Sequence, residues 1–195
     1  MATMKGIIKK TRLEEYSRPR QGGIIGITLE SEDELENVQL TDQESELILA
    51  TAAGKAVRFH EEDIRTVGRS GKGVRGIRLK AKDRVIGMVK ADPGKFLLTI
   101  TEKGYGKRTP VSEYRLISRG GSGVIDIVSN ERNGAVVAIK CVSDKEEVMV
   151  VSQQGSIIRI PISGVGVIGR NTQGVRIMKL EEGDKVVSAA LVKAE

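Results

Sequence analysis

Residues 46–79 read ELILATAAGKAVRFHEEDIRTVGRSGKGVRGIRL and contain most of one unit of a pattern that organises the whole chain. An apolar run, Glu46–Thr51, is followed by a turn at Gly54 and a second apolar run, Ala56–Phe59. Two short runs on either side of a glycine turn predict a β-hairpin. A second glycine turn leads into Val74–Leu79, where apolar residues alternate with basic or small ones, and this alternation predicts a third strand.

The two glycines of this unit recur about every fifty residues. The first glycine recurs at steps of 48, 50 and 51 residues, at Gly6, Gly54, Gly104 and Gly155. The second recurs at steps of 50, 50 and 51 residues, at Gly23, Gly73, Gly123 and Gly174. A register that holds through four copies indicates structural repeats. We therefore predict a single repeat domain over 1–195, with units at 1–46, 47–94, 95–145 and 146–195.

The other units contain strand patterns at matching places. The hairpin strands are expected at Lys95–Thr101, Glu147–Ser152 and Ser156–Ile160, and a third strand at Val175–Leu180. A fourth strand is expected at Val85–Val89, Ala135–Cys141 and Val186–Val192. Four short strands per unit, without long helical periodicity, predict an all-β protein of about four propeller-like, four-stranded blades.

The first unit begins in the middle of its pattern, because the strand that leads into Ala2-Thr3 is missing. We therefore expect the chain to be a piece of a longer repeat array. The sequence leaves open whether the blades close into a ring or form an open arc.

The amino-acid composition indicates what kind of molecule the protein binds. The net charge of +6 and the pI near 9.5 favour a polyanion. Aromatic residues make up only 3% of the chain, and tryptophan is absent. Since binding to single strands relies on aromatic stacking, this composition favours the phosphates of a duplex. The single cysteine, the short apolar runs and the lack of an apolar signal segment predict a cytoplasmic protein without disulfides or membrane spans.

Basic residues gather at two places in each unit, and we predict that they bind DNA. Those on the strand after the first glycine are Lys9, Lys10, Arg12, Arg58, Lys107, Arg108 and Arg159. Those on the loop and strand around the second glycine are Arg18, Arg20, Arg69, Lys72, Arg75, Arg78, Arg119, Arg170 and Arg176. Because blades repeat around an axis, equivalent positions trace an arc that could follow a bent phosphate backbone.

The first of these groups has a competing interpretation. Lys10, Arg58, Arg108 and Arg159 occupy one register, and a structural salt bridge in each blade would produce the same register. Acidic residues at matching positions nearby support this alternative: Glu15, Asp63 and Glu113. The loop arginines Arg69, Arg119 and Arg170 are therefore the better candidates for phosphate contacts.

The residues for catalysis are not apparent. His60 is the only histidine, which argues against a histidine-based metal cluster or catalytic triad. We expect His60 at a strand end, Cys141 in the core and Tyr105 in an ordinary turn. We predict no catalytic centre, no cofactor and no metal site.

Glu30–Glu46 contains eight acidic and no basic residues. We expect this segment to be a solvated loop that faces away from DNA, or alternatively to contact a basic partner domain.

Three segments resemble successive blades of the C-terminal DNA-wrapping domain of the DNA gyrase A protein. They are EKGYGKRTPVSEY (Glu102–Tyr114), GRSGKGVRGIRL (Gly68–Leu79) and VIGRNTQGV (Val167–Val175). The resemblance covers essentially the whole chain. The corresponding domain of topoisomerase IV shares the repeat, but Arg170–Gly174 (RNTQG) favours gyrase.

The resemblance implies a β-pinwheel, usually of six blades that exchange strands, which wraps duplex DNA around its rim. It implies a non-catalytic accessory domain of an ATP-dependent type II topoisomerase that introduces negative supercoils in the bacterial cytoplasm, at the nucleoid. The implied partners are the rest of the gyrase A protein and the gyrase B protein, and the isolated domain is expected to be a monomer. The family's box Gln-Arg-Arg-Gly-Gly-Lys-Gly has no intact copy here, only degenerate relatives at Arg18–Gly23 and Arg69–Gly73.

The sequence thus favours duplex binding with bending, and it predicts weak sequence preference because no recognition helix is present to reach base edges. Two alternatives remain: a protein-interaction propeller whose basic rim binds an acidic partner, and the weaker-wrapping topoisomerase IV domain.

Overall fold

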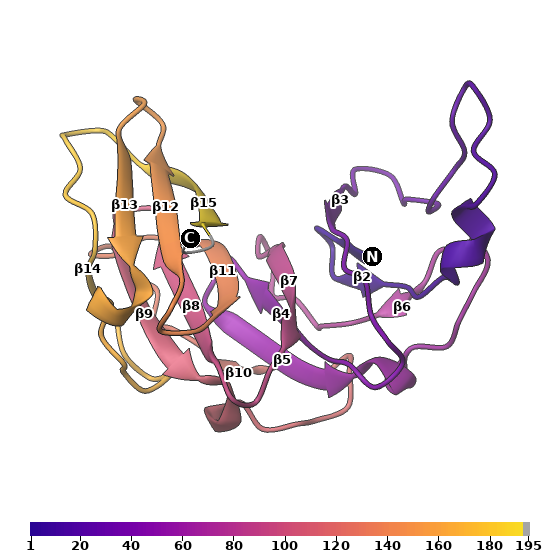
Figure 1. The fold of residues 1–195 in the computed structure, drawn as a ribbon, viewed down its shortest axis with the longest axis horizontal. Helices are drawn as coiled ribbons and strands as arrows, with labels where there is room; N and C mark the ends of the chain where they lie inside the picture. The colour runs from indigo at the N-terminus through magenta and orange to yellow at the C-terminus, as the bar shows by residue number, and fades with distance from the viewer. Residues whose placement is uncertain (193–195) are drawn as a thin grey trace.

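A computed structural model describes residues 1–192 as four small antiparallel sheets that follow one another along an open arc (Figure 1). Of the two arrangements left open by the sequence, the open arc is the one observed. Apart from the strands, four single-turn 3-10 helices are present: η1 (Leu13–Tyr16), η2 (Glu61–Asp63), η3 (Val111–Glu113) and η4 (Ile162–Gly164). Across 1–192 no helix has the length and apolar character needed to span a membrane.

The strands form four blades. In spatial order across its sheet, blade 1 contains β3 (Leu35–Asn37), β1 (Ala2–Thr3), β2 (Ile7–Ile8) and β6 (Val74–Arg75). Blade 2 contains β7 (Val85–Ala91), β4 (Glu46–Thr51), β5 (Lys55–His60) and β10 (Val124–Ile125). Blade 3 contains β11 (Val136–Val142), β8 (Phe96–Thr101), β9 (Tyr105–Pro110) and β14 (Val175–Arg176). Blade 4 contains β15 (Val186–Val192), β12 (Glu147–Ser152) and β13 (Ile157–Pro161).

The predicted hairpins are confirmed, and each of the first three blades also receives a strand from the next repeat unit. We call β6, β10 and β14 the exchange strands. In blade 3, for example, Arg176 of β14 pairs with Tyr105 of β9. In each four-stranded sheet the exchange strand lies at the outer edge of the arc, and β3, β7 or β11 lies at the inner edge (Figure 1).

The third strands predicted over Val74–Leu79 and Val175–Leu180 are too long, because only two residues of each pair with the neighbouring blade. After these residues the pairing ends, and the next two N–H groups of each unit donate to the carbonyl oxygen of a single glycine, Gly6 or Gly104. The next core side chain in each unit, Ile77 or Met178, is buried between blades, with 2% and 3% of its surface exposed. The first three blades have the four strands that the sequence predicts, and the described part of blade 4 has three.

The hydrophobic core lies between blades, where three clusters occupy the three junctions. Alternate residues of one strand serve different clusters: Leu47 and Leu49 of β4 pack between blades 1 and 2, whereas Ile48 packs between blades 2 and 3. This alternation follows from the strand geometry, in which successive side chains point to opposite faces. Each blade is therefore stabilised by its neighbours.

The glycine register has a conformational cause. All eight repeat glycines have a positive φ, between +68° and +90°. Gly54, for example, has a φ of +76°, and a Cβ atom there would lie 2.3 Å from the carbonyl oxygen of Ile127 in the next unit. A side chain at this position would both strain the backbone and separate two blades.

Candidate nucleic-acid interface

Two of the lysines predicted to bind DNA are buried between blades. The Lys9 ammonium donates hydrogen bonds to the carbonyl oxygens of Gly68 (3.1 Å) and Arg69. The equivalent Lys107 donates to carbonyl oxygens of Asp126 (2.5 Å) and Arg170 (2.9 Å). Burial lowers the pKa of Lys9, and it lowers the pKa of Lys107 to about 8. Both side chains hold the glycine-rich loop of the following unit against the blade that precedes it.

Arg58 is also buried. Its guanidinium donates to the Glu46 carboxylate (Nε to Oε2, 2.6 Å) and to the carbonyl oxygens of Val111 and Tyr114 at 3.0 Å. The last two acceptors belong to the η3 turn of the next unit, so Arg58 bridges blades 2 and 3.

Arg108 repeats this arrangement one unit later. Its Nε atom donates to the carbonyl oxygen of Val165 at 2.7 Å, next to η4, and its guanidinium pairs with Asp144. With only 7% of its surface exposed, Arg108 bridges blades 3 and 4 as Arg58 bridges blades 2 and 3.

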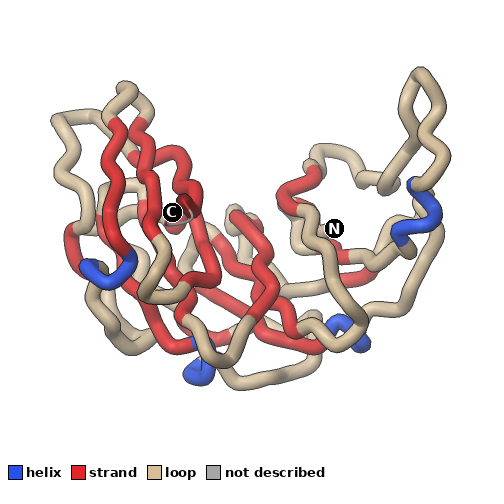
Figure 2. The backbone as a smooth tube through the Cα atoms, in the orientation of Figure 1, coloured by secondary structure: helices blue, strands red, loops and turns tan. Residues whose placement is uncertain are grey.

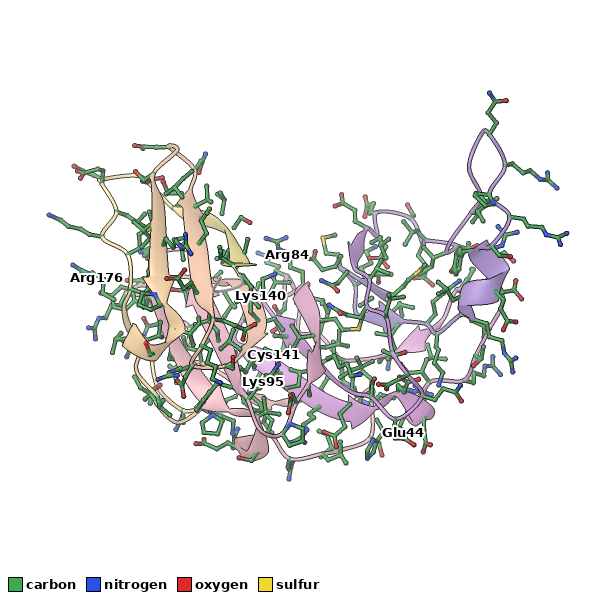
Figure 3. The ribbon with its side chains drawn as sticks, in the orientation of Figure 1. Glu44, Arg84, Lys95, Lys140, Cys141 and Arg176 are labelled. Carbon is green, nitrogen blue, oxygen red and sulfur yellow. The ribbon has the colours of Figure 1, made fainter. Side chains whose placement is uncertain are left out.

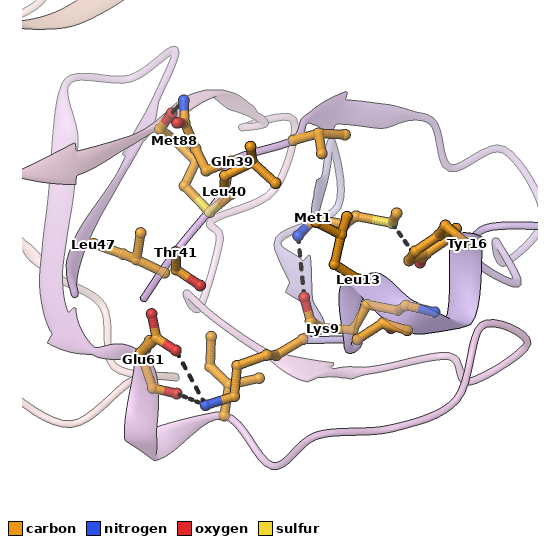
Figure 4. A pocket seen from close by; sticks show the side chains of 14 residues that line it. Met1, Lys9, Leu13, Tyr16, Gln39, Leu40, Thr41, Leu47, Glu61 and Met88 are labelled. Atoms are coloured by element: carbon orange, nitrogen blue, oxygen red, sulfur yellow. Dashed lines mark hydrogen bonds and ion pairs between the residues drawn. The ribbon is translucent and has the colours of Figure 1, made fainter. Parts of the chain in front are cut away.

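The two outer members of this series are less enclosed. Lys10 is half-buried beside an apolar pocket of about 250 Å³ and pairs with Glu61 at 3.4 Å (Figure 4). Arg159 is exposed and pairs with Glu147 of its own blade. The salt-bridge interpretation of this series is therefore the one the geometry supports. The acids involved are Glu46, Glu61, Asp144 and Glu147, not the predicted Glu15, Asp63 and Glu113.

These placements correct the predicted DNA-binding set. Lys9, Lys107, Arg58 and Arg108 cannot reach a phosphate without breaking their bonds between blades, because their charged groups are enclosed by backbone carbonyls. We remove these four residues from the candidate interface.

The loop arginines occupy equivalent places at three successive junctions. Each donates a hydrogen bond to a carbonyl oxygen of the preceding unit: Arg69 to Ile25 (3.1 Å), Arg119 to Arg75 (3.1 Å) and Arg170 to Ile125 (2.9 Å). All three side chains are half-buried. These bonds orient the guanidinium groups in the same way at each junction while part of each group stays open to solvent.

The remaining basic residues of the predicted set are exposed: Arg12, Arg18, Arg20, Lys72, Arg75, Arg78 and Arg176. Arg75 and Arg176 lie on exchange strands, which follow the outer edge of the arc (Figures 1 and 3). The 3-10 turns also lie on this convex side (Figure 2). Arg20 and Arg69, from different units, line one hollow of about 460 Å³. The outer edge therefore carries positive charge from successive blades.

Other exposed basic residues lie outside the predicted set, among them Arg65, Arg115, Lys103 and Arg132. Arg65 and Arg115 directly follow the core residues Ile64 and Tyr114, and both are exposed. Arg65 and Arg115 could have been found from the sequence, because their separation of 50 residues matches the repeat. Lys103 and Arg132 also had basic counterparts at the repeat spacing: Lys5 precedes the first glycine of unit 1 as Lys103 does in unit 3, and Lys82 lies 50 residues before Arg132.

In blade 1 the strand at the inner edge of the arc is acidic, whereas the outer edge is basic. This inner strand, β3, belongs to the acidic segment Glu30–Glu46, which was expected to be a loop. Asp33 accepts hydrogen bonds from the backbone N–H groups of Lys5 (2.8 Å) and Glu34 (2.9 Å), so part of the acidity stabilises local turns. Within this segment, β3 lies across the first blade from the exchange strand β6, whereas Glu44 lies near the convex side (Figures 1 and 3).

His60, Cys141 and Tyr105 are the side chains that the sequence analysis considered for catalysis or metal binding, and the structure places each of them on a strand. His60 is exposed at the end of β5, and Cys141 lies on β11 against the core, as predicted. Tyr105 is not a turn residue: it begins β9 and has 6% of its surface exposed. Within residues 1–192, no group of three or more histidine, cysteine or acidic side chains is placed to hold a metal ion.

A family model described as "DNA gyrase C-terminal domain, beta-propeller" matches residues 1–42, 45–92, 95–143 and 146–193. The DNA gyrase A protein of Klebsiella oxytoca is 46% identical over 188 residues, covering 96% of this chain and 22% of the relative. That of Buchnera aphidicola subsp. Acyrthosiphon pisum is 55% identical over 188 residues, covering 96% of this chain and 23% of the relative. The chain thus spans less than a quarter of the length of these relatives.

Solved structures show the same fold. The C-terminal domain of DNA topoisomerase IV aligns with a TM-score of 0.93 at 26% identity, covering 98% of this chain and 60% of that domain. The DNA gyrase A C-terminal domain aligns with a TM-score of 0.89 at 26% identity, covering 97% of this chain and 64% of that domain. The fold is therefore a β-pinwheel. It does not separate the two enzymes, whereas the sequence matches favour gyrase.

Proposed function

The chain belongs to the DNA gyrase C-terminal domain family, and on that premise we propose that it binds duplex DNA along the outer edge of its blades and bends it. The observation that carries the proposal is the equivalent placement of Arg69, Arg119 and Arg170 at three successive junctions. A bent phosphate backbone would meet the same guanidinium group at each step along the arc. Arg75 and Arg176 add exposed charge at the same edge.

The energetics are compatible with bending. Bending a segment of about 20–30 bp by about 40–90° costs on the order of 1–6 kcal/mol. A charge-assisted hydrogen bond to a phosphate contributes about 1.5–3 kcal/mol, so a few such contacts offset the cost. Contacts to phosphate carry no base information, and we expect binding to tolerate most sequences.

We extend the proposal to the longer protein of which such a domain forms part. There the domain would act as the non-catalytic, DNA-wrapping accessory of an ATP-dependent type II topoisomerase. It would work with the remainder of the gyrase A protein and with the gyrase B protein in the cytoplasm to bias strand passage towards negative supercoils. The isolated domain is expected to be a monomer.

The test measures affinity for a fluorescent duplex of about 30 bp, a length suited to bending, over a series of salt concentrations. The double variant Arg69→Gln/Arg119→Gln removes two charges from the outer edge. The control Arg84→Gln/Lys140→Gln removes two charges that lie towards the inner side (Figure 3). Each lost phosphate contact reduces the slope of the log binding constant against the log salt concentration by about 0.9. The slope should therefore fall by about 1.8 in the outer-edge variant and should hardly change in the control.

Two outcomes would refute the proposal. The first is the absence of duplex binding by the unmodified chain at low salt, especially if poly-glutamate binds instead, which would favour an acidic protein partner. The second is an equal loss of affinity in both double variants, which would mean that only net charge matters. Energy transfer between dyes at the duplex ends reports bending, and we expect the ends to approach one another on binding.

A further inference from the structure

A cluster of arginines surrounds Tyr105 at the junction of blades 3 and 4. The phenol oxygen of Tyr105 lies 3.4 Å from Nε of Arg132 and 3.2 Å from a terminal nitrogen of Arg176. The guanidinium carbons lie over the tyrosine ring, at 5.2 Å and 5.6 Å from its centroid. Two cations from segments far apart in the chain therefore converge on one neutral group.

The topology accounts for this convergence. Arg176 pairs with Tyr105 across the β14–β9 ladder, which brings their side chains together as cross-strand neighbours. Arg132 comes from the turn before β11, which the Asn133 side chain holds in place by donating to the carbonyl oxygens of Val128 (2.9 Å) and Gln173 (3.0 Å). Both guanidinium groups are thus positioned by the fold.

In the part of the chain that the structure describes, neither Arg132 nor Arg176 forms an ion pair. Two acidic residues, Glu181 and Asp184, also line the pocket. Of these, Asp184 accepts hydrogen bonds from the backbone N–H groups of Gln154 (3.0 Å) and Lys185 (2.8 Å). Its charge is therefore already used to hold a turn.

The arginines line a pocket of about 380 Å³ whose wall also includes Lys103 and Lys179. Contacts with an aromatic face offset only part of the repulsion between two guanidinium groups, since each contributes about 0.5–1 kcal/mol at an exposed site. An oxyanion in this pocket would neutralise both groups and could accept their paired N–H donors in bidentate fashion. The geometry is suited to a phosphate.

We propose that Arg132 and Arg176, supported on Tyr105, form a phosphate-binding site that receives a backbone phosphate of the duplex. The proposal rests on the proposed function. The site is separate from the repeated loop arginines because it exists in one unit only: residues Ile7, Lys55 and Ser156 occupy the position of Tyr105 in the other units. It would fix the register of the DNA on the arc at one point, whereas the loop arginines hold it at every junction.

Two measurements test the site. The first compares duplex affinity and salt slope of the unmodified chain with Arg132→Gln/Arg176→Gln, and uses Arg84→Gln/Lys140→Gln as a control that removes two basic side chains lying towards the inner side of the arc (Figure 3). We expect the site variant to lose about tenfold or more in affinity beyond the control. Its salt slope should fall by about 1.8.

The second measurement follows the ionisation of Tyr105 by tyrosinate absorbance, with Tyr105→Phe to assign the signal. Hydrogen bonds from Arg132 and then Arg176 lower the pKa of this phenol. Inorganic pyrophosphate bound between the arginines would bring negative charge close to the phenol and should raise that pKa. The site variant should show no response to pyrophosphate.

The outcomes are distinct. A selective loss of duplex affinity together with a pyrophosphate response supports the site. A pyrophosphate response without loss of duplex affinity would overturn the assignment to DNA and indicate a free phosphate ligand. No response and no loss would overturn the site altogether. If the unmodified chain fails to bind duplex, the proposed function fails, and the tyrosine titration still decides whether the pocket binds phosphate.

Discussion

Arg58 and Arg159 occupy the same position on the second hairpin strand of their units, and they test whether this position bridges blades or binds DNA. Substituting Arg58 by methionine would remove the guanidinium donor from the carbonyl oxygen of Tyr114 and from that of Val111, which keeps only the Tyr114 N–H, and would leave the Glu46 carboxylate unpaired. A buried polar group without a partner costs about 1–3 kcal/mol, and the loss of one member of a buried ion pair costs about 3–5 kcal/mol. We therefore expect Arg58→Met to reduce the free energy of unfolding by about 3–5 kcal/mol.

Arg159 supplies the matched control within the same molecule. It occupies the same register but is exposed, and its only partner in the described chain is Glu147. An exposed pair contributes about 0–1 kcal/mol, so Arg159→Met should leave stability almost unchanged. Both variants remove one positive charge from the same position of the repeat.

Urea denaturation, followed by circular dichroism, measures the difference. With a denaturant slope of about 1–3 kcal/mol per molar, the midpoint of Arg58→Met should fall by about 1 M or more. The midpoint of Arg159→Met should remain near that of the unmodified chain. Equal midpoints for the two variants would refute the bridging role, and a loss of duplex affinity without loss of stability in Arg58→Met would restore the DNA-binding interpretation.

Three further predictions concern buried groups. Because burial lowers the pKa of Lys107 to about 8, the unfolded chain binds a proton that the folded chain lacks between about pH 8 and the ordinary lysine value near 10.4. Stability should therefore rise with pH over this window by up to about 3 kcal/mol, and Lys107→Met should lack this rise. Gly104→Ala should destabilise the fold more than Gly155→Ala, because a Cβ atom at Gly104 would lie 2.4 Å from the Met178 carbonyl oxygen whereas the one at Gly155 meets nothing within 4 Å, although φ is positive at both. Burial raises the pKa of the Cys141 thiol, so its reaction with a thiol reagent at neutral pH should be slow until urea unfolds the protein, and fast labelling of the folded protein would contradict this.

Much of the fold could be predicted because each unit repeats the same local signals. The runs around Gly54 predict the hairpin that the structure contains, since a turn glycine and flanking β-formers act over a few residues. The short exchange strands could not be given their correct length, because the sequence of Val74–Leu79 continues to alternate after Arg75 although the strand pairing ends there. The turn η2 was also missed, since Glu61–Asp63 carries no apolar period.

The candidate site was harder to predict, because basic residues that hold the blades together and basic residues proposed to face DNA both recur with the repeat of about fifty residues. Lys107 holds a loop between blades and Arg119 projects towards solvent, yet both recur with the repeat in other units. Periodicity alone cannot separate them, since any contact between neighbouring blades recurs as regularly as any contact with a curved ligand. The strand context does separate them. Lys107 lies within β9 between buried neighbours, whereas Arg119 stands among glycines outside any strand.

The same reasoning explains why the unit-specific site at Tyr105 escaped detection. A search for repeated charge finds positions that are alike in every unit, and it passes over a residue such as Tyr105, whose position holds Ile7, Lys55 and Ser156 in the other units. A register for a bound duplex, however, requires something that differs between blades, because a perfectly repeated edge would hold the DNA equally well after a shift of one unit. In a repeat protein, the residue that departs from the period is therefore the better candidate for fixing position, and the residues that obey it supply affinity or hold the blades together.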